Sequence, residues 1–235
     1  MKRASHWSLA GALAQMVAWL ALFNLTMAVI SRTAHAEATA SPIEIVALGD
    51  SLTAGYMLAP SEAFPAQLEK ALLSRGHKVK IANAGVSGDT TGGGLARFAW
   101  AVPETTDAVI LELGANDALR GIDPALVRAN LDRLLTELGK RGIPVLLAGM
   151  KAPRNWGDDY AHAFDAIYAE LASRHGALLD PFFLDGIALD PMLNLGDGLH
   201  PNAQGVGRIV DRILPLAEEL VARARTPAKA STARN

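Results

Sequence analysis

The chain has 235 residues, of which 50% are hydrophobic and 20% are charged, and its formal net charge is −2. These values are typical of one globular domain and exclude a disordered chain. The chain has no cysteine, which excludes a disulfide framework and a lipid-modified cysteine. No basic run occurs outside a sparse C-terminal tail, so we expect no nucleic-acid partner.

Residues 1–36 have the layout of an export signal. They contain no acidic residue, begin Met1-Lys2-Arg3, continue through an uncharged stretch over residues 4–31 and end in Ala34-His35-Ala36. This order predicts a signal peptide cleaved after Ala36, which leaves no stable membrane span and a net charge of −5. The alternative is an uncleaved anchor, because a stretch of about 20 apolar residues can span a bilayer. Both outcomes place the rest of the chain outside the cytoplasm, in the periplasm or secreted.

Apolar runs predict strands, and the amphipathic segments between them predict helices. We expect strands over residues 43–48, 79–82, 108–113 and 144–150, and helices over residues 64–75, 124–141, 160–175 and 203–222. Strands that are apolar on both faces and alternate with helices indicate a parallel sheet covered on each side. The prediction is an α/β fold, a three-layer α/β/α sandwich with about five strands, as one domain over residues 37–225. Residues 226–235 are expected to form a disordered tail.

Ser51 follows the first predicted strand within Gly49-Asp50-Ser51-Leu52-Thr53-Ala54-Gly55. The chain turns there from strand into a helical segment, so its hydroxyl is expected at the sheet edge, near the partial positive charge of a helix start. That position suits a nucleophile whose reaction develops negative charge. Serine is also a common helix N-cap, and Ser51 alone does not separate the two interpretations.

His200 lies in Asp197-Gly198-Leu199-His200-Pro201, a loop before the last predicted helix. Asp197 can fold back to accept a hydrogen bond from the imidazole, which leaves the other ring nitrogen free to take a proton from Ser51. The alternative is a turn that only caps the helix. The other three histidines of residues 37–235, His77, His162 and His175, lie on or beside predicted helices and are expected to be surface residues.

A serine activated by a histidine in this way is typical of enzymes that transfer acyl groups. That reaction also needs hydrogen-bond donors for the oxyanion that forms when the serine attacks a carbonyl. Asn116, after the third predicted strand, can donate through its side-chain amide, and Gly88 can donate a backbone N–H from a loop in which a side chain would obstruct the substrate. Three nearby acids, Asp50, Asp89 and Asp117, are expected to bond backbone N–H groups rather than a metal.

The segments around Ser51, Gly88, Asn116 and His200 resemble, in this order, the four blocks of the SGNH or GDSL-type hydrolase family. The first three blocks are similar to those of periplasmic bacterial members described as thioesterase, lysophospholipase and arylesterase. The resemblance covers residues 43–220. It implies a flavodoxin-like sheet, a catalytic triad of Ser51, Asp197 and His200, an oxyanion hole of Ser51, Gly88 and Asn116, and no metal or organic cofactor.

The expected substrate is a small molecule that contains an ester or thioester bond: a fatty acyl ester or thioester, a lysophospholipid or an aryl ester. The enzyme is expected to be a monomer. Loops at the same sheet edge are largely apolar, which suits an acyl chain better than a sugar. The residues expected to bind substrate are Leu52, Leu119, Pro153 and Trp156. The alternatives are an esterase for acetylated carbohydrates on the same fold and a flavodoxin-like binding module without catalysis.

Overall fold

The computed structural model describes residues 41–226, which form an α/β sandwich. The expected signal over residues 1–36 and almost all of the expected tail lie outside the described residues. No helix within residues 41–226 is long and apolar enough to cross a membrane.

Five parallel strands form one sheet in the order β2-β1-β3-β4-β5. They are β1 (Ile43–Gly49), β2 (Val79–Gly85), β3 (Ala108–Glu112), β4 (Val145–Ala148) and β5 (Leu178–Asp180). This is the flavodoxin-like order, in which the chain reverses its direction of winding between β1 and β3. The predicted parallel sheet is therefore confirmed.

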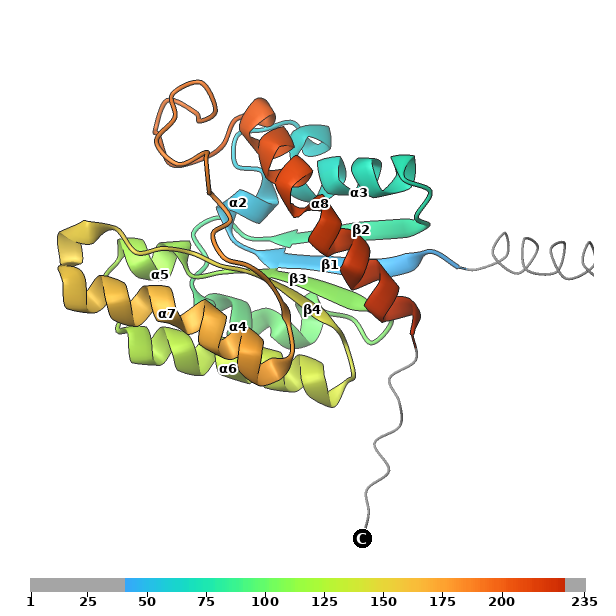
Figure 1. Ribbon diagram of the computed structural model, residues 1–235, viewed down its shortest axis with the longest axis horizontal. Helices are drawn as coiled ribbons and strands as arrows, with labels where there is room; N and C mark the ends of the chain where they lie inside the picture. Colours follow the sequence, from blue (N-terminus) through green and yellow to red (C-terminus); the bar gives the residue numbers. More distant parts are fainter. Residues whose placement is uncertain (1–40, 227–235) are drawn as a thin grey trace, which may run out of the picture. The chain divides into compact units, whose positions relative to one another are not determined.

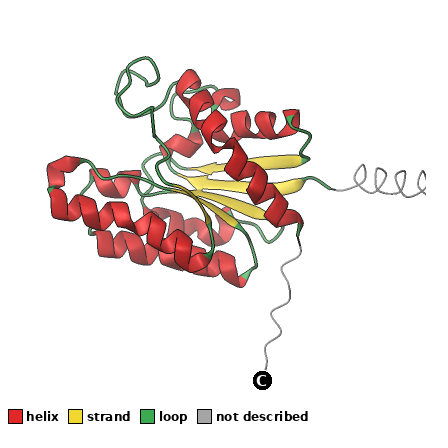
Figure 2. Ribbon diagram, viewed as in Figure 1, coloured by secondary structure: helices red, strands yellow, loops and turns green. Residues whose placement is uncertain are grey.

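Helices cover both faces of the sheet (Figures 1 and 2). On one face, α3 (Phe64–Ser74) packs against α8 (Ala203–Arg225) and β2. On the other face, α4 (Thr91–Ala101), α6 (Pro124–Lys140) and α7 (Asp158–His175) pack in turn against one another. The three predicted layers are confirmed. Leucine, isoleucine and valine side chains of β1, β3 and β4 form the centre of the core.

Short helical turns connect the strands to the larger helices at the carboxyl edge of the sheet. They are α2 (Ser51–Ala54), α5 (Ala115–Leu119), η1 (Pro60–Glu62) and η2 (Arg154–Trp156). The turns α2 and α5 begin within three residues of the ends of β1 and β3. The side chains of these two turns therefore face one another where the winding reverses, and ligands of open α/β sheets bind at that place.

Two elements differ from the sequence prediction. The strand β2 continues to Gly85, beyond the expected end at residue 82, and the helix α4 was not among the predicted helices. Its glycines allow close packing: a Cβ on Gly94 would lie 2.3 Å from Leu113 Cδ1, and one on Gly93 would lie 2.4 Å from Asp89 Oδ1. The other element is β5, which has only three residues and was not located from the sequence.

Candidate active site

Ser51 is the first residue of α2, directly after β1. Asp50 is the N-cap of α2, and its Oδ1 accepts a hydrogen bond from Leu52 N at 3.0 Å. The cap is therefore Asp50, so the interpretation of Ser51 as an N-cap is wrong. Ser51 is 8% exposed, which leaves its hydroxyl accessible at the sheet edge.

Ser51, His200 and Asp197 form one chain of hydrogen bonds. His200 Nε2 lies 2.9 Å from Ser51 Oγ, and His200 Nδ1 lies 2.7 Å from Asp197 Oδ2. An ionised carboxylate only accepts hydrogen bonds, so Nδ1 carries the ring proton of the neutral imidazole. Nε2 is then left as the acceptor for the Ser51 hydroxyl proton. The structure thus brings these three predicted residues together.

Backbone donors keep Asp197 ionised. Its Oδ1 accepts from Leu199 N at 2.9 Å and from His200 N at 3.0 Å. These bonds, followed by the bond from the His200 side chain, lower the pKa of Asp197 to about 2. Asp197 is therefore a carboxylate at every pH at which the imidazole can accept a proton.

The loop that carries His200 is fixed by backbone bonds rather than by burial. Leu195 N donates to His200 O at 2.7 Å, and Asn194 forms an antiparallel bridge with Pro201. Asn202 then caps α8 by accepting from Gly205 N at 2.9 Å. On the other side, the Tyr56 ring lies 4.5 Å from the imidazole ring, centroid to centroid. The loop does cap the last helix, but the capping residue is Asn202. Capping therefore does not occupy His200, whose side chain contacts Ser51 instead.

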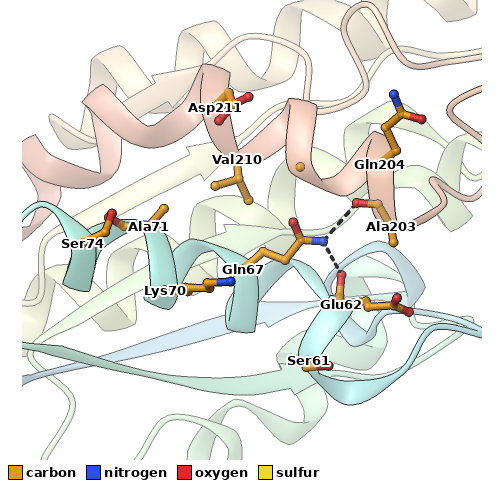
Figure 3. A pocket seen from close by; sticks show the side chains of 11 residues that line it. Ser61, Glu62, Gln67, Lys70, Ala71, Ser74, Ala203, Gln204, Val210 and Asp211 are labelled. Atoms are coloured by element: carbon orange, nitrogen blue, oxygen red, sulfur yellow. Dashed lines mark hydrogen bonds between the residues drawn. The ribbon is translucent and has the colours of Figure 1, made fainter.

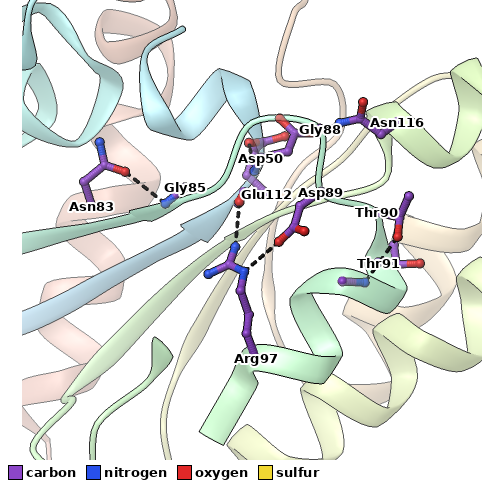
Figure 4. A network of polar contacts seen from close by, with 12 residues as sticks. Asp50, Asn83, Gly85, Gly88, Asp89, Thr90, Thr91, Arg97, Glu112 and Asn116 are labelled. Carbon is purple, nitrogen blue, oxygen red and sulfur yellow. Dashed lines mark hydrogen bonds and ion pairs between the residues drawn. The ribbon is translucent and has the colours of Figure 1, made fainter. Parts of the chain in front are cut away.

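The two predicted oxyanion donors, Asn116 and Gly88, come from different elements near Asp50 (Figure 4). Asn116 lies in α5, and its Nδ2 donates one hydrogen bond to Asp50 Oδ2 at 3.0 Å, which leaves a second N–H on the same nitrogen. Gly88 has a φ of +84°, which few residues with a side chain adopt, and its carbonyl accepts from Arg120 Nη2 at 2.9 Å. Arg120 follows α5, so this bond ties the Gly88 loop to the Asn116 turn.

Glu112, the last residue of β3, is a buried acid that the sequence reasoning did not single out. Its side chain is fully buried, and its Oε2 accepts from Thr53 Oγ1 at 2.7 Å and from Asp50 N at 3.3 Å. Burial, and then the charge of Asp50, raise the pKa of Glu112 well above its ordinary value. A charged residue between Leu111 and Leu113 was the available signal, because apolar strands seldom carry an acid without a role.

The other predicted acids make structural contacts. Asp117 accepts from Thr91 N at 2.8 Å and from Thr91 Oγ1 at 2.7 Å, and so fixes the start of α4. Asp89 pairs instead with Arg97, whose Nε lies 2.6 Å from Asp89 Oδ2 and whose Nη2 donates to Gly49 O at 2.8 Å (Figure 4). The expectation of a backbone partner is therefore wrong for Asp89. Within residues 41–226, no three acidic or histidine side chains form a group that could hold a metal.

Two of the remaining histidines have partners that local spacing did not reveal. His77 Nε2 lies 3.3 Å from Glu218 Oε1, and His175 Nε2 lies 2.7 Å from Asp132 Oδ1. Both are half-buried, so the expectation of simple surface residues is wrong for them, while His162 is exposed. Their partners are distant in sequence, which explains why a search over three residues missed them.

A mostly apolar cavity of about 340 Å³ opens beside the Ser51 hydroxyl. Its walls include three of the predicted substrate residues, Leu52, Leu119 and Pro153, together with Asn116 and His200. The fourth, Trp156, is not among the lining residues. Its indole Nε1 donates to Ala118 O at 2.9 Å and its ring packs on Gly121, so it supports α5 from behind. Lys151 and further apolar side chains complete the walls: Ala115, Ala118, Met150, Ala152, Phe182, Leu184, Ala188, Leu189 and Leu199.

A larger cavity of about 620 Å³ lies between α3 and α8 and contains none of the residues above (Figure 3). Most of its lining residues are polar, and Gln67 Nε2 joins the two sides by donating to Glu62 O at 2.8 Å and to Ala203 O at 3.1 Å. Nothing in this cavity resembles a nucleophile with a base, so the smaller apolar cavity is the candidate active site.

Comparison with known proteins agrees with this geometry. Residues 47–208 match the GDSL-like lipase/acylhydrolase family. An arylesterase of Vibrio mimicus is 38% identical over 76% of this chain and 88% of its own length. Thioesterase 1/protease 1/lysophospholipase L1 of Escherichia coli K12 is 36% identical over 75% of this chain and 84% of its own length. The crystal structure of AlinE4, described as an SGNH-hydrolase family esterase, has a TM-score of 0.65 and 46% identity over 77% of this chain and 97% of its own.

Proposed function

Since this chain belongs to the GDSL-like lipase/acylhydrolase family and is a hydrolase of carboxylic esters and thioesters, we propose that Ser51 is its nucleophile. The observation that carries this proposal is the continuous hydrogen-bonded chain from Asp197 through His200 to Ser51, at the mouth of an apolar cavity. We further propose that fatty acyl, lysophospholipid or aryl esters and thioesters are the substrates.

In the proposed mechanism, Ser51 Oγ attacks the acyl carbonyl carbon while its proton passes to His200 Nε2. Asp197 stabilises the resulting imidazolium through the bond to Nδ1. Backbone N–H groups of Ser51 and Gly88 and the Asn116 amide stabilise the oxyanion. His200 then protonates the leaving alcohol or thiol. Water then enters and attacks the acyl carbon while its proton passes to His200 Nε2. The bond between Ser51 Oγ and the acyl carbon breaks, the acid leaves, and His200 returns the proton to Ser51 Oγ.

The apolar cavity supports an acyl chain rather than a sugar as the bound group. Each buried methylene contributes about 0.8 kcal/mol, or about fourfold in kcat/KM when the transition state keeps the contact. We therefore expect kcat/KM for p-nitrophenyl esters and acyl thioesters to rise with chain length until the cavity is filled.

Narrowing the cavity should remove that gain. Ala188 lines the cavity but is exposed, so Ala188→Phe adds volume without overpacking the core. We expect this variant to keep acetyl-ester hydrolysis within about threefold and to lose most of the rise with chain length, about fourfold per excluded methylene. Ala222→Phe, on the exposed side of α8, is the matched control. A wild-type profile that falls from acetyl onward, with activity on acetylated sugars, would instead favour the carbohydrate esterase.

We also propose that the protein is exported through the N-terminal signal, as a monomer over residues 37–225. The support is the order of basic start, apolar stretch and small-residue site in residues 1–36. The intact mass of the exported protein is expected to correspond to a chain that starts at Glu37. A mass that retains Met1 would indicate the anchor instead.

A further inference from the structure

The side chain of Asp50 lies between the nucleophile turn and Asn116. It is fully buried; Oδ1 accepts from Leu52 N and Oδ2 accepts from Asn116 Nδ2, each at 3.0 Å. The mechanism above assigns nothing to this carboxyl group. Both of its oxygens receive N–H donors, which is the pattern that a carboxylate, and no other form of the side chain, satisfies fully.

The Asp50 carboxylate decides which end of the Asn116 amide faces it. An asparagine amide presents two donors on Nδ2 and an acceptor at Oδ1, and the two ends have nearly the same shape. Rotation of the amide by half a turn would place its Oδ1 against Asp50 Oδ2, so that two acceptors would meet in a buried site. With one Nδ2 hydrogen on Asp50, the direction of the other hydrogen is set by the planar amide. Asp50 thereby selects the donor end for the oxyanion.

Glu112 anchors this arrangement from below. Its Oε2 holds both Asp50 N and Thr53 Oγ1, while Oε1 is buried without a hydrogen-bond partner within the described residues. Gly49 makes room for it: a Cβ there would lie 2.7 Å from Glu112 Oε2 and 2.1 Å from Thr53 Oγ1. The same Cβ would lie 2.7 Å from the backbone oxygen of Glu112, so position 49 requires glycine.

The protonation of the pair agrees with this geometry. Burial raises the pKa of Asp50 to about 6, although its bonds from Leu52 and Asn116 oppose the rise. Burial, and then the charge of Asp50, also raise the pKa of Glu112 well above its ordinary value. Asp50 receives an N–H donor on each oxygen, whereas Glu112 Oε1 has no partner within the described residues, so the geometry favours the negative charge of the pair on Asp50.

We propose that Asp50 is a positioning residue whose carboxylate holds the Asn116 amide with Nδ2 toward the oxyanion, and that Glu112 fixes Asp50 in this orientation. The inference rests on the proposed function, since it concerns the oxyanion formed by Ser51. It adds a role for the second residue of the Gly49-Asp50-Ser51 segment beyond capping α2.

A double-mutant cycle tests the proposal. Asp50→Asn keeps the size of the side chain but cannot accept at both positions, so the Asn116 amide loses its fixed direction. We expect kcat to fall about 10- to 100-fold with KM changed less than about threefold. This loss is smaller than the loss of about 100- to 1000-fold that follows complete removal of an oxyanion donor. In the Asn116→Ala background, Asp50→Asn should lower kcat less than about threefold. Effects that multiply in the double variant would overturn the proposal.

The controls separate this role from stability and from the proposed function itself. Asp180→Asn changes another buried acid at the carboxyl edge of the sheet that pairs with Arg212 rather than Asn116. It should leave kcat per active site unchanged. The concentration of active sites is measured by titration with a serine-directed phosphonate. If the wild-type protein does not react with it, the assignment of Ser51 as nucleophile is refuted rather than the positioning role of Asp50. If Asp50→Asn does not fold, the smaller Asp50→Ser repeats the cycle.

The pH dependence provides a readout that a purely structural role would not move. The raised pKa means that Asp50 is ionised above about pH 6 and becomes protonated below it, when Oδ2 no longer accepts freely from Asn116. Protonation of Asp50 should lower wild-type activity in acid, so the slope of log kcat/KM against pH below about pH 6 should be smaller by about 1 in Asp50→Asn than in the wild type. An unchanged slope would contradict the proposal.

Discussion

Replacing Ser51 with alanine is expected to lower kcat for a short aryl ester by about a million-fold, to the level left by binding and oxyanion contacts alone. The reason is that Oγ is the atom 2.9 Å from His200 Nε2, and no other hydroxyl approaches this nitrogen within the described residues. Hydrolysis of a p-nitrophenyl ester measures the loss. Alanine removes only one oxygen from a side chain that is nearly buried, so the thermal unfolding transition should stay within a few degrees.

Covalent labelling checks the same prediction independently of turnover. A serine-directed phosphonate should add one adduct to the wild type, mapped to Ser51, and none to Ser51→Ala. Ser74→Ala, whose hydroxyl bonds to Ala71 O on the exposed side of α3, is the control and should label fully. If Ser51→Ala still takes up the label, another residue is the nucleophile.

Replacing Asp197 with asparagine is expected to lower kcat about 1,000- to 10,000-fold with a smaller effect on KM. Asparagine can present its amide nitrogen to the ring, which favours the tautomer with the proton on Nε2 and removes the acceptor for the Ser51 proton. It also removes the negative charge 2.7 Å from Nδ1 that stabilises the imidazolium. Steady-state kinetics at saturating ester measure the effect.

The pH profile of the wild type gives a second check on Asp197. Its pKa is lowered to about 2, so the carboxylate is protonated only as the pH falls through that value, and Asp197 should not shape the activity profile above about pH 4. Asp190→Asn, in the same loop, is the matched control for Asp197→Asn, because the Asp190 carboxylate accepts only from the local Met192 N at 2.8 Å. Retention of activity by Asp197→Asn within tenfold would remove Asp197 from the triad.

Most of the sheet could be predicted because its strands are buried on both faces and are therefore apolar throughout. The apolar runs that contain Ile45, Ile110 and Leu146 are buried in the sheet, and a central strand of a parallel sheet is the environment that such runs favour. The strand β5 has only three residues, too few for a periodic signal. The helix α4 begins Thr91-Gly92-Gly93-Gly94, a sequence of low helix propensity, and it forms because these glycines let the helix approach Leu113 and Asp89.

The sequence predicted that Ser51, Asn116 and His200 would meet, because Ser51 and Asn116 follow strand ends and His200 lies in a loop with a nearby carboxylate. The buried support was not. Glu112 lies within an apolar strand, and its contacts with Thr53 and Asp50 depend on the register between β1 and β3, which pairs Gly49 with Glu112. Trp156 has the character of a substrate platform, but the turn at η2 directs its indole to Ala118 O instead. Such differences arise from tertiary packing, which a single sequence does not display.

Ser51 and His200 lie 149 residues apart in the chain, yet their side chains meet. Ser51 is synthesised early, whereas His200 is added only after all five strands. A partly translated chain therefore lacks the imidazole that we propose activates Ser51. Under the proposed mechanism, hydrolysis begins only when the loop before α8 has folded against the turn that carries Ser51.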